Sequence, residues 1–228
     1  MGRKKKNTRA VSVEYELWFE DNSPCHISLR VDPIGESLQY SVAQKIVLLF
    51  SKKGDWVLDP FAGFGTVLEV CQKNNRKCMG IERQVKRVHH CKKKIKSENI
   101  VMLEGDALKE LKKLKKPRFF DFCLMDPPFF GFLYTNGKKT KNYSEHLSFL
   151  QKIFKQVFKK LRRGSYCIVG TKNVYKKGRL FPLACDLAHL LKKAGFKPFP
   201  EIVRVRKKIG RGGRKETRTY FLLVNQKK

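Results

Sequence analysis

Residues 57–66 read VLDPFAGFGT and carry the strongest fold signal in the chain. Their apolar beginning predicts a buried strand, and residues 66–73 have the spacing of an amphipathic helix. The glycines between them let the backbone approach a ligand, and the helix N-terminus offers N–H groups. Asp59 ends the strand, and its carboxylate would repel a pyrophosphate and attract a cation. The stretch therefore predicts a ligand-binding β-α unit that favours a cationic ligand over NAD or ATP.

Strand and helix patterns alternate around this stretch. We expect strands at residues 56–59, 77–81, 100–103, 120–125, 166–170, 202–206 and 219–224, and helices at 41–50, 66–73, 84–97, 107–114, 144–161 and 183–193. The alternation predicts an α/β fold, with a mostly parallel seven-stranded sheet and helices on both faces. Residues 207–218 are too short for a helical crossover, so the last two strands should form an antiparallel C-terminal hairpin.

The beginning of the chain differs in character from the rest. Residues 1–10 form a basic arm that we expect to be disordered in isolation. Residues 11–19 alternate as a strand does, and residues 26–31 form a weaker strand pattern. We expect one domain over residues 11–228.

The charge balance indicates a polyanionic partner. The chain has 51 Lys and Arg against 20 Asp and Glu, a formal net charge of +31. A lysine-rich thermophilic surface usually balances lysine with glutamate, and this chain does not. Since no amphipathic anchor or lipidation motif is present, we expect nucleic acid rather than a membrane.

The seven cysteines indicate a reducing compartment rather than a disulfide framework, because none of them form a C-x-x-C pair. Six are expected to be buried free thiols: Cys71, Cys78, Cys91, Cys123, Cys167 and Cys185. No four-ligand spacing surrounds Cys25-His26 or His89-His90, so we expect no metal. Without a signal peptide or a membrane-length apolar run, we expect an intracellular, cytoplasmic protein, associated with the nucleoid if the source is prokaryotic.

Two further predicted strands are followed by acidic residues. In a dinucleotide-type fold, a carboxylate at the position of Glu82 accepts hydrogen bonds from ribose hydroxyls. Asp106-Ala107 is placed to receive an adenine edge. Each has an ordinary alternative: Glu82 would be a surface acid at a helix start, and Asp106 would be an N-cap. Together with Asp59, however, they predict a ligand site at the carboxyl ends of the strands.

Residues 126–129, DPPF, follow the apolar strand pattern of residues 120–125. The two prolines fix the backbone and remove two N–H donors, which leaves nearby carbonyls as acceptors. Rigid acceptors beside an aromatic ring suit a planar group that carries an NH2. A nucleobase with an exocyclic amine is such a group.

The motifs in this order carry a family resemblance. DPFAGFGT at residues 59–66, then Glu82, Asp106 and DPPF at residues 126–129, resembles the S-adenosylmethionine-dependent amino-methyltransferases, in particular the DNA adenine-N6 and cytosine-N4 methylases. Their motifs read D-P-F-x-G-x-G-T and (D/N/S)-P-P-(Y/F/W). The resemblance extends from about residue 41 to residue 224. It implies a Rossmann-like class I methyltransferase fold and S-adenosyl-L-methionine as the cofactor.

The resemblance also implies residue roles. The implied cofactor-binding residues are Asp59, Pro60, Phe61, Ala62, Gly63, Gly65, Thr66, Glu82, Asp106 and Ala107, and the implied catalytic residues are Asp126, Pro127, Pro128 and Phe129. Asp59 and the glycine loop would hold the methionine part, Glu82 the ribose and Asp106 the adenine amino group. Asp126 and the Pro127 carbonyl would align the target NH2.

Two aromatic residues complete the catalytic motif. Phe129 would stack on a base taken out of its helix. Most relatives have tyrosine here, and phenylalanine keeps the stacking ring but lacks the hydroxyl. We expect Phe130 to pack in the core rather than behind that ring.

Two basic segments would contact nucleic acid, since no insertion is large enough for a separate target-recognition domain. The first is residues 131–142 and the second residues 207–218, which is glycine-rich and able to follow a phosphate backbone. The candidate contacts are Lys138, Lys139, Lys141, Lys207, Lys208, Arg211, Arg214 and Lys215. A solvated hairpin tip is the alternative for the second segment.

The expected activity is methylation of an exocyclic amino group of a nucleobase in DNA, by a site-specific DNA methyltransferase. Adenine N6 comes first because aspartate at the head of the catalytic motif is commoner in adenine enzymes, and cytosine N4 comes second. Two alternatives stay open. One is an RNA methyltransferase acting on guanine N2 or adenine N6. The other is an inactive nucleic-acid-binding subunit of a methylase complex.

Overall fold

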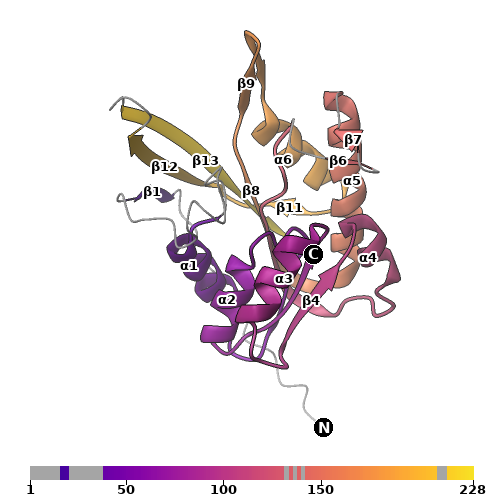
Figure 1. Ribbon diagram of the computed structural model, residues 1–228. Coiled ribbons are helices and arrows are strands. Elements are labelled where there is room, and N and C mark those ends of the chain that lie inside the picture. The colour runs from indigo at the N-terminus through magenta and orange to yellow at the C-terminus, as the bar shows by residue number, and fades with distance from the viewer. Residues whose placement is uncertain (1–15, 21–37, 131–133, 136–137, 140–141, 210–214) are drawn as a thin grey trace, which may run out of the picture.

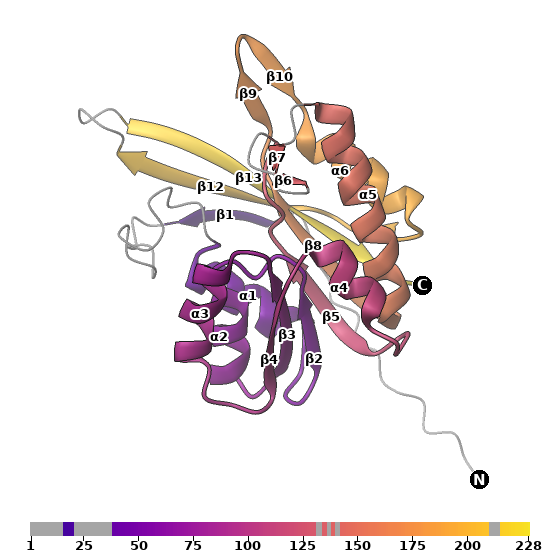
Figure 2. The same cartoon turned by 45° about the vertical axis from the view of Figure 1, so that its right-hand side comes forward.

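The computed structural model describes residues 16–20, 38–130, 134–135, 138–139, 142–209 and 215–228. Side chains are described at 38–130, 142–205 and 219–228. A central sheet carries helices on both faces (Figures 1 and 2). The predicted α/β class is therefore confirmed. The expectations for residues 1–10 and 26–31 lie outside the described residues.

The main sheet has nine strands among the described residues, in the order β1-β12-β13-β8-β5-β2-β3-β4, with β11 paired to β13. The seven predicted strands are β2 (Trp56–Asp59), β3 (Lys77–Glu82), β4 (Ile100–Glu104), β5 (Phe120–Met125), β8 (Leu161–Thr171), β12 (Ile202–Ile209) and β13 (Lys215–Gln226). The neighbouring strands β4, β3, β2, β5 and β8 pair in parallel, whereas β13 is antiparallel to both β8 and β12. The C-terminal hairpin is thus confirmed.

Two short strands extend this sheet. β1 (Glu16–Glu20) pairs in parallel with β12, and it forms the described part of the strand predicted at residues 11–19. β11 (Lys197–Pro198) pairs with the end of β13 and was not predicted, because two residues are too few to show a period.

Helices of the described residues cover both faces of the sheet (Figure 2). They are α1 (Tyr40–Phe50), α2 (Thr66–Lys73) and α3 (Val85–Lys94) on one face, and α4 (Ala107–Lys113), α5 (Tyr143–Lys160) and α6 (Leu183–Lys193) on the other. Each set closes its own hydrophobic core. The sequence had placed all six within a few residues of these bounds.

Strand β5 shows why the central strands are apolar throughout. Phe122 and Leu124 point into the core under α1–α3, while Cys123 and Met125 point into the core under α4–α6. All four are fully buried. A strand covered on both faces reads as a continuous apolar run, and each large side chain contributes about 1.5–3 kcal/mol of burial free energy.

Two small hairpins stand apart from the main sheet. β6 (Tyr134–Thr135) pairs with β7 (Lys138–Lys139), and β9 (Val174–Lys176) pairs with β10 (Arg179–Phe181). Neither was predicted as a hairpin. The second turns through Lys177 and Gly178, whose φ angles of 50° and 74° are those of a two-residue I′ turn.

The cysteine prediction is confirmed with one correction. Cys71, Cys78, Cys91, Cys123 and Cys167 are buried free thiols, but Cys185 is exposed. It lies on the solvent side of α6, whose core side carries Leu183 and Leu187. Within the described part of the chain, no group of three or more metal-ligating side chains occurs, and no helix is both long and apolar enough to cross a membrane.

Candidate active site

Three carboxylates come together at the carboxyl edge of the sheet. Asp59 ends β2, Glu82 ends β3, and Asp126 follows β5. The pKa of Asp59 is raised to about 8, mainly by burial; a hydrogen bond from the Phe61 N–H lowers it, and the nearby carboxylates of Asp126 and Glu82 raise it. The parallel topology therefore brings two of the predicted acidic strand ends, Asp59 and Glu82, together with Asp126 of the DPPF motif.

The glycine loop is held by two of these carboxylates. The Phe61 N–H donates to Asp59 Oδ1 at 3.1 Å, and the Gly63 N–H donates to Glu82 Oε2 at 3.1 Å. Gly63 and Gly65 have φ angles of 55° and 82°, so the turn needs residues without a Cβ. Gly65 is the N-cap of α2, which begins at Thr66. Strand ends and loop thus form one rigid unit.

The same loop packs closely onto β3 through Gly80. A Cβ at this position would lie 2.6 Å from Leu68 Cδ1 and 2.9 Å from the Ala62 Cβ. Ala62 and Pro60 are buried. Gly80 therefore lets the loop and α2 approach the strand, a role that its place before Glu82 did not reveal.

Glu82 and Asp106 differ in their surroundings. Glu82 is buried, and its Oε1 also accepts a hydrogen bond from the Gln84 N–H at 2.7 Å. Glu82 is therefore not a surface residue, but it does lie at a helix start, because Gln84 is the N-cap of α3. Asp106 is the N-cap of α4, its Oδ1 accepting from the Lys109 N–H at 3.1 Å, while Ala107 begins that helix and is buried. The ordinary N-cap is present at Asp106, and an adenine contact stays a prediction.

Room for the Asp126 side chain depends on the neighbouring strand. Asp126 is half-buried, and Pro127 beside it is buried. A Cβ on Gly170, near the end of β8, would lie 2.9 Å from Asp126 Oδ1 and 3.4 Å from its Cγ. Only glycine at position 170 leaves the carboxylate where it is.

A cation covers the ring of Phe129. This ring is 7% exposed, and the Lys172 ammonium lies 4.4 Å from its centroid and 5.7 Å from that of Tyr220. The Arg204 guanidinium lies 4.8 Å from the same Tyr220 ring. Such contacts stabilise by about 0.5–2 kcal/mol. A base that stacks on the covered face of Phe129 must displace the ammonium.

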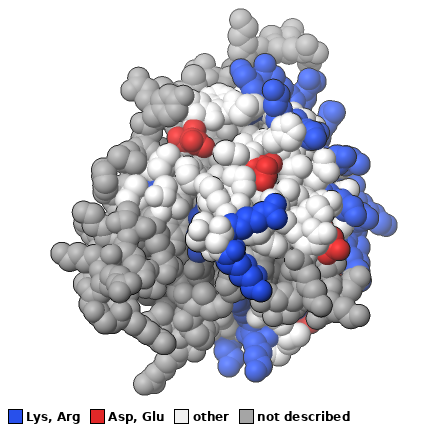
Figure 3. Space-filling model, turned by 90° about the horizontal axis from the view of Figure 1, so that it is seen from above, with Lys and Arg blue, Asp and Glu red and all other residues white. Residues whose placement is uncertain are grey.

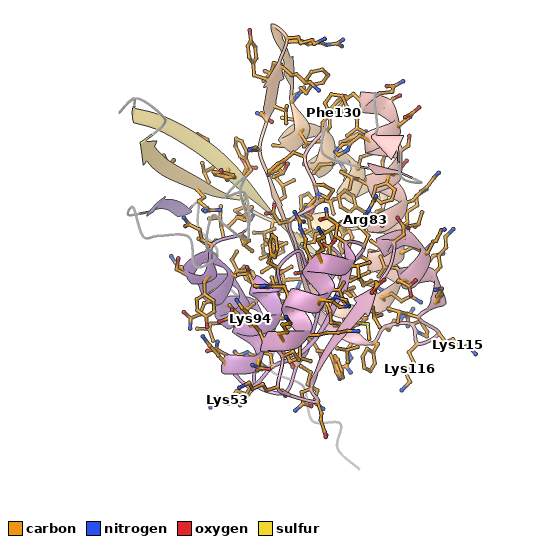
Figure 4. All side chains as sticks on the ribbon, in the orientation of Figure 1. Lys53, Arg83, Lys94, Lys115, Lys116 and Phe130 are labelled. Atoms are coloured by element: carbon orange, nitrogen blue, oxygen red, sulfur yellow. The ribbon has the colours of Figure 1, made fainter. Side chains whose placement is uncertain are left out.

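Phe130 belongs to a separate aromatic cluster. Its ring centroid lies 5.1 Å from that of Tyr143, 4.8 Å from Phe181 and 5.8 Å from His146. Phe130 is buried, so the prediction that it packs in the core is confirmed. Figure 4 shows it in the upper part of the molecule, at the base of the β9–β10 hairpin.

Two polar groups of this cluster differ in their partners. The Tyr143 hydroxyl donates to Asp186 Oδ2 at 2.6 Å and joins α5 to α6. Within the described residues, neither ring nitrogen of His146 has a hydrogen-bond partner. Burial lowers the pKa of His146 to about 4, so the imidazole is neutral at pH 7.

The predicted nucleic-acid contacts cannot be placed as side chains. Lys138 and Lys139 form β7, Lys207 and Lys208 lie in β12, and Lys215 begins β13, but only their backbone is described. Lys141, Arg211 and Arg214 lie outside the described residues. These assignments remain predictions.

The sequence analysis missed three components of this edge: Gly170, Lys172 and the β9–β10 hairpin. All three lie at or just after the end of β8, which parallel pairing sets beside β5 and the DPPF motif. A glycine and a lysine after an apolar run carry little signal by themselves. Their importance arises from the neighbouring strand.

The sheet order and the acidic carboxyl edge define a Rossmann-like methyltransferase fold. It is similar to a precorrin-6y C5,15-methyltransferase from Geobacter metallireducens, with a TM-score of 0.62, 13% identity and coverage of 91% of this chain and 96% of the other. TrmN from Thermus thermophilus gives a TM-score of 0.56 and 20% identity over 84% of this chain and 49% of its own. At these identities, the likeness establishes the fold.

The sequence comparisons narrow this class. Residues 39–93 match the family model described as DNA methylase. Type II methyltransferase M2.DpnII from Streptococcus pneumoniae is 34% identical over 56 residues, and M.Cfr9I from Citrobacter freundii is 56% identical over 36. These matches cover 25% and 16% of this chain but 21% and 12% of the relatives' lengths. The matches support a relationship of this chain to the S-adenosylmethionine-dependent DNA amino-methyltransferases, and they imply S-adenosylmethionine as the cofactor.

Proposed function

We propose that this protein transfers a methyl group from S-adenosylmethionine to an exocyclic amino group of a nucleobase in DNA, adenine N6 before cytosine N4. The observation that carries the proposal is the position of the DPPF motif. It follows β5 directly beside β2, the strand that ends in the glycine loop and belongs to the matched segment 39–93. Donor site and acceptor motif thus lie on adjacent strands.

The acidic edge fits the proposed cofactor. Asp59 and Glu82 are buried carboxylates that converge on one glycine loop, and burial keeps the pKa of Asp59 high. A cationic ligand reduces the cost of ionising such a group. S-adenosylmethionine carries an ammonium and a sulfonium, and when bound it supplies an electrophilic methyl carbon. The donor set therefore suits this molecule better than a pyrophosphate.

The proposal gives the chain's own residues the roles that the resemblance implies. Asp59 and the loop at residues 60–66 bind the methionine part, Glu82 binds ribose hydroxyls, and Asp106 with Ala107 lies at the adenine. Asp126 and the Pro127 carbonyl accept hydrogen bonds from the target NH2, which points the nitrogen lone pair towards the methyl group. Pro128 fixes the loop, and Phe129 stacks on the extruded base after Lys172 has moved aside.

The test is direct identification of the product. The protein is incubated with methyl-labelled S-adenosylmethionine and separate DNA and RNA pools, and nucleosides from each pool are then analysed by mass spectrometry. We expect N6-methyladenine or N4-methylcytosine in DNA. Labelled RNA with unlabelled DNA would refute the DNA assignment, while retaining an amino-methyltransferase acting on guanine N2 or adenine N6.

A cofactor titration separates an enzyme from an inactive subunit. By calorimetry, we expect saturable binding of S-adenosylmethionine. Absence of binding, together with retained nucleic-acid affinity, would overturn the enzyme proposal and favour the nucleic-acid-binding subunit.

A further inference from the structure

The β9–β10 hairpin projects beyond the carboxyl ends of the central strands (Figures 1 and 2). Only two residues separate the end of β8 from the start of β9. Because β8 pairs with β5, the hairpin stands beside the DPPF motif. Figure 3 views the molecule from this end, and Lys and Arg cover more of the described surface than Asp and Glu. A polyanion approaching Asp126 from above would meet this hairpin.

The two faces of the hairpin have different surroundings. In the antiparallel register Tyr175 pairs with Leu180, and Val174 pairs with Phe181. Directly paired residues project to the same face, and successive residues project to opposite faces. Phe181 packs against Phe130 at 4.8 Å, so the face that carries it is anchored to the aromatic cluster. The opposite face presents Tyr175 and Leu180.

The opposite face exposes large apolar side chains to solvent, which is unusual in the described part of the chain. Tyr175 is 73% exposed and Leu180 is 55% exposed, among the few large apolar side chains exposed in the described residues. Lys176 and Arg179 are exposed as well, but they alternate with Tyr175 and Leu180 and therefore project from the face that carries Phe181. Lys177 is exposed in the turn between the two strands. An exposed aromatic ring on one face lets an unpaired base stack, and cations on the other face and in the turn of the same narrow hairpin can neutralise the flanking phosphates.

The hairpin is also mechanically linked to the catalytic motif. The Lys176 ammonium lies 5.7 Å from the Phe130 ring centroid, and the Arg179 guanidinium lies 5.4 Å from that of Phe181. The tight I′ turn at Lys177-Gly178 restricts the tip. A nucleic-acid strand that contacts the tip of the hairpin can therefore be positioned relative to Phe129 and Asp126.

We infer that the β9–β10 hairpin is a nucleic-acid-binding element, in which Tyr175 stacks on an unpaired base next to the target and Lys176, Lys177 and Arg179 contact the flanking phosphates. This inference rests on the proposed function and names the surface that positions the substrate. Charge complementarity between a chain of net charge +31 and a polyanion supports this occupant over a protein partner.

The experiment compares four full-length variants with the wild type. Tyr175→Ala removes the stacking ring, and Tyr175→Phe retains it. A triple variant, Lys176→Gln, Lys177→Gln and Arg179→Gln, removes three charges from the hairpin. Its matched control removes three exposed charges from the opposite end of the molecule, Lys53→Gln, Lys115→Gln and Lys116→Gln (Figure 4). Fluorescence anisotropy with a labelled single-stranded DNA gives the affinity, and its salt dependence gives the number of phosphate contacts.

We expect Tyr175→Ala to weaken DNA binding about 10-fold and Tyr175→Phe to restore the wild-type affinity. The hairpin triple variant should lower the slope of log K against log salt by about 2, and the control triple variant should leave it unchanged. The affinity for S-adenosylmethionine should stay the same in all four variants.

The outcomes separate this inference from the proposed function. Wild-type affinity in Tyr175→Ala, or equal slopes for the two triple variants, overturns the hairpin assignment even if the wild type methylates DNA. Hairpin-dependent binding by a wild type that methylates neither DNA nor RNA supports the hairpin and refutes the enzyme. A wild type that binds no nucleic acid refutes the hairpin assignment and leaves Tyr175 and Leu180 to a protein partner.

Discussion

In the half of the sheet that contains β2 and β3, carboxyl side chains are buried, whereas in the half that contains β8 and β13, positive charge lies over aromatic rings. Asp59 and Glu82 are held by N–H groups of the glycine loop. Lys172 and Arg204 are held over Phe129 and Tyr220. The first half suits a small cation and the second an anionic chain that carries aromatic bases.

The two halves also differ in how their contacts are made. The acidic half uses backbone groups and strand ends close in sequence, so its geometry depends little on distant segments. The basic half joins Lys172, which directly follows β8, with side chains from β12, β13 and the DPPF motif. We therefore expect changes in the acidic half to alter cofactor affinity, and changes at the boundary between the halves to alter methyl transfer.

Asp126 lies at this boundary, and its removal should have the largest effect. Asp126→Ala removes the acceptor that we propose aligns the target amine, so the rate of methyl transfer should fall about 10²- to 10³-fold with unchanged cofactor affinity. Single-turnover assays and calorimetry measure the two quantities. Asp121→Ala, the same change at the other end of β5, is the control. A fully active Asp126→Ala protein would refute the assignment.

Gly170 tests the same boundary from the opposite strand. Its replacement by alanine should displace the Asp126 carboxylate and lower the rate about 10²-fold, because a new Cβ would stand 2.9 Å from Asp126 Oδ1. Cofactor affinity and melting temperature should change little. A rate within twofold of the wild type would show that the carboxylate position is not critical.

Asp59→Asn should affect the acidic half alone. In the proposed function Asp59 is the charged partner of the methionine ammonium, so the substitution should weaken S-adenosylmethionine binding about 10- to 100-fold. Below pH 8 the wild type should release a proton on binding, because the ligand favours ionised Asp59. Calorimetry in buffers of different ionisation enthalpy detects that proton. Equal proton release by the asparagine variant would exclude Asp59 as its source.

The same substitution should stabilise the fold. The pKa of Asp59 is about 8 when folded against an ordinary 3.8, so the folded state binds more protons between about pH 4 and pH 8. This contribution to stability is therefore lost as the pH rises through that window. Asp59→Asn should raise the free energy of unfolding by about 1–3 kcal/mol at pH 8.5 and by little near pH 4. Denaturant unfolding at both pH values measures the difference.

The smallest expected effect concerns the support of the basic half. Tyr143→Phe removes the hydrogen bond to Asp186 and should cost about 1–2 kcal/mol of unfolding free energy. Tyr175→Phe, the same change at an exposed tyrosine, is the control and should cost nothing measurable. Equal melting temperatures for both variants would mean that the bond between α5 and α6 contributes no net stability.

The difference between the halves explains what the sequence could predict. The bounds of β2 and α2, the acidic strand ends and the DPPF loop were accessible because period, glycine spacing and strand-end carboxylates are local signals. Gly170 and Lys172 were not, because their roles arise only when β8 pairs with β5. The β9–β10 hairpin has strands of three residues, too short for alternation to register. The prediction that Cys185 is buried was wrong, because an amphipathic helix can place a single cysteine on its outer face as readily as on its inner face.

The position of β13 has a consequence for the order in which the protein forms during synthesis. β13 ends at Gln226 and separates β8 from β12, and β12 in turn carries β1. Strands β2, β3, β4, β5 and β8 can pair as they leave the ribosome, because each is joined to a neighbour in the sheet through a local β-α unit. β1 and β12 join that sheet only through β13. β1 can therefore join the sheet only after β13 has been synthesised. The strands that carry Asp59 and Glu82 can pair before β12 and β13 do.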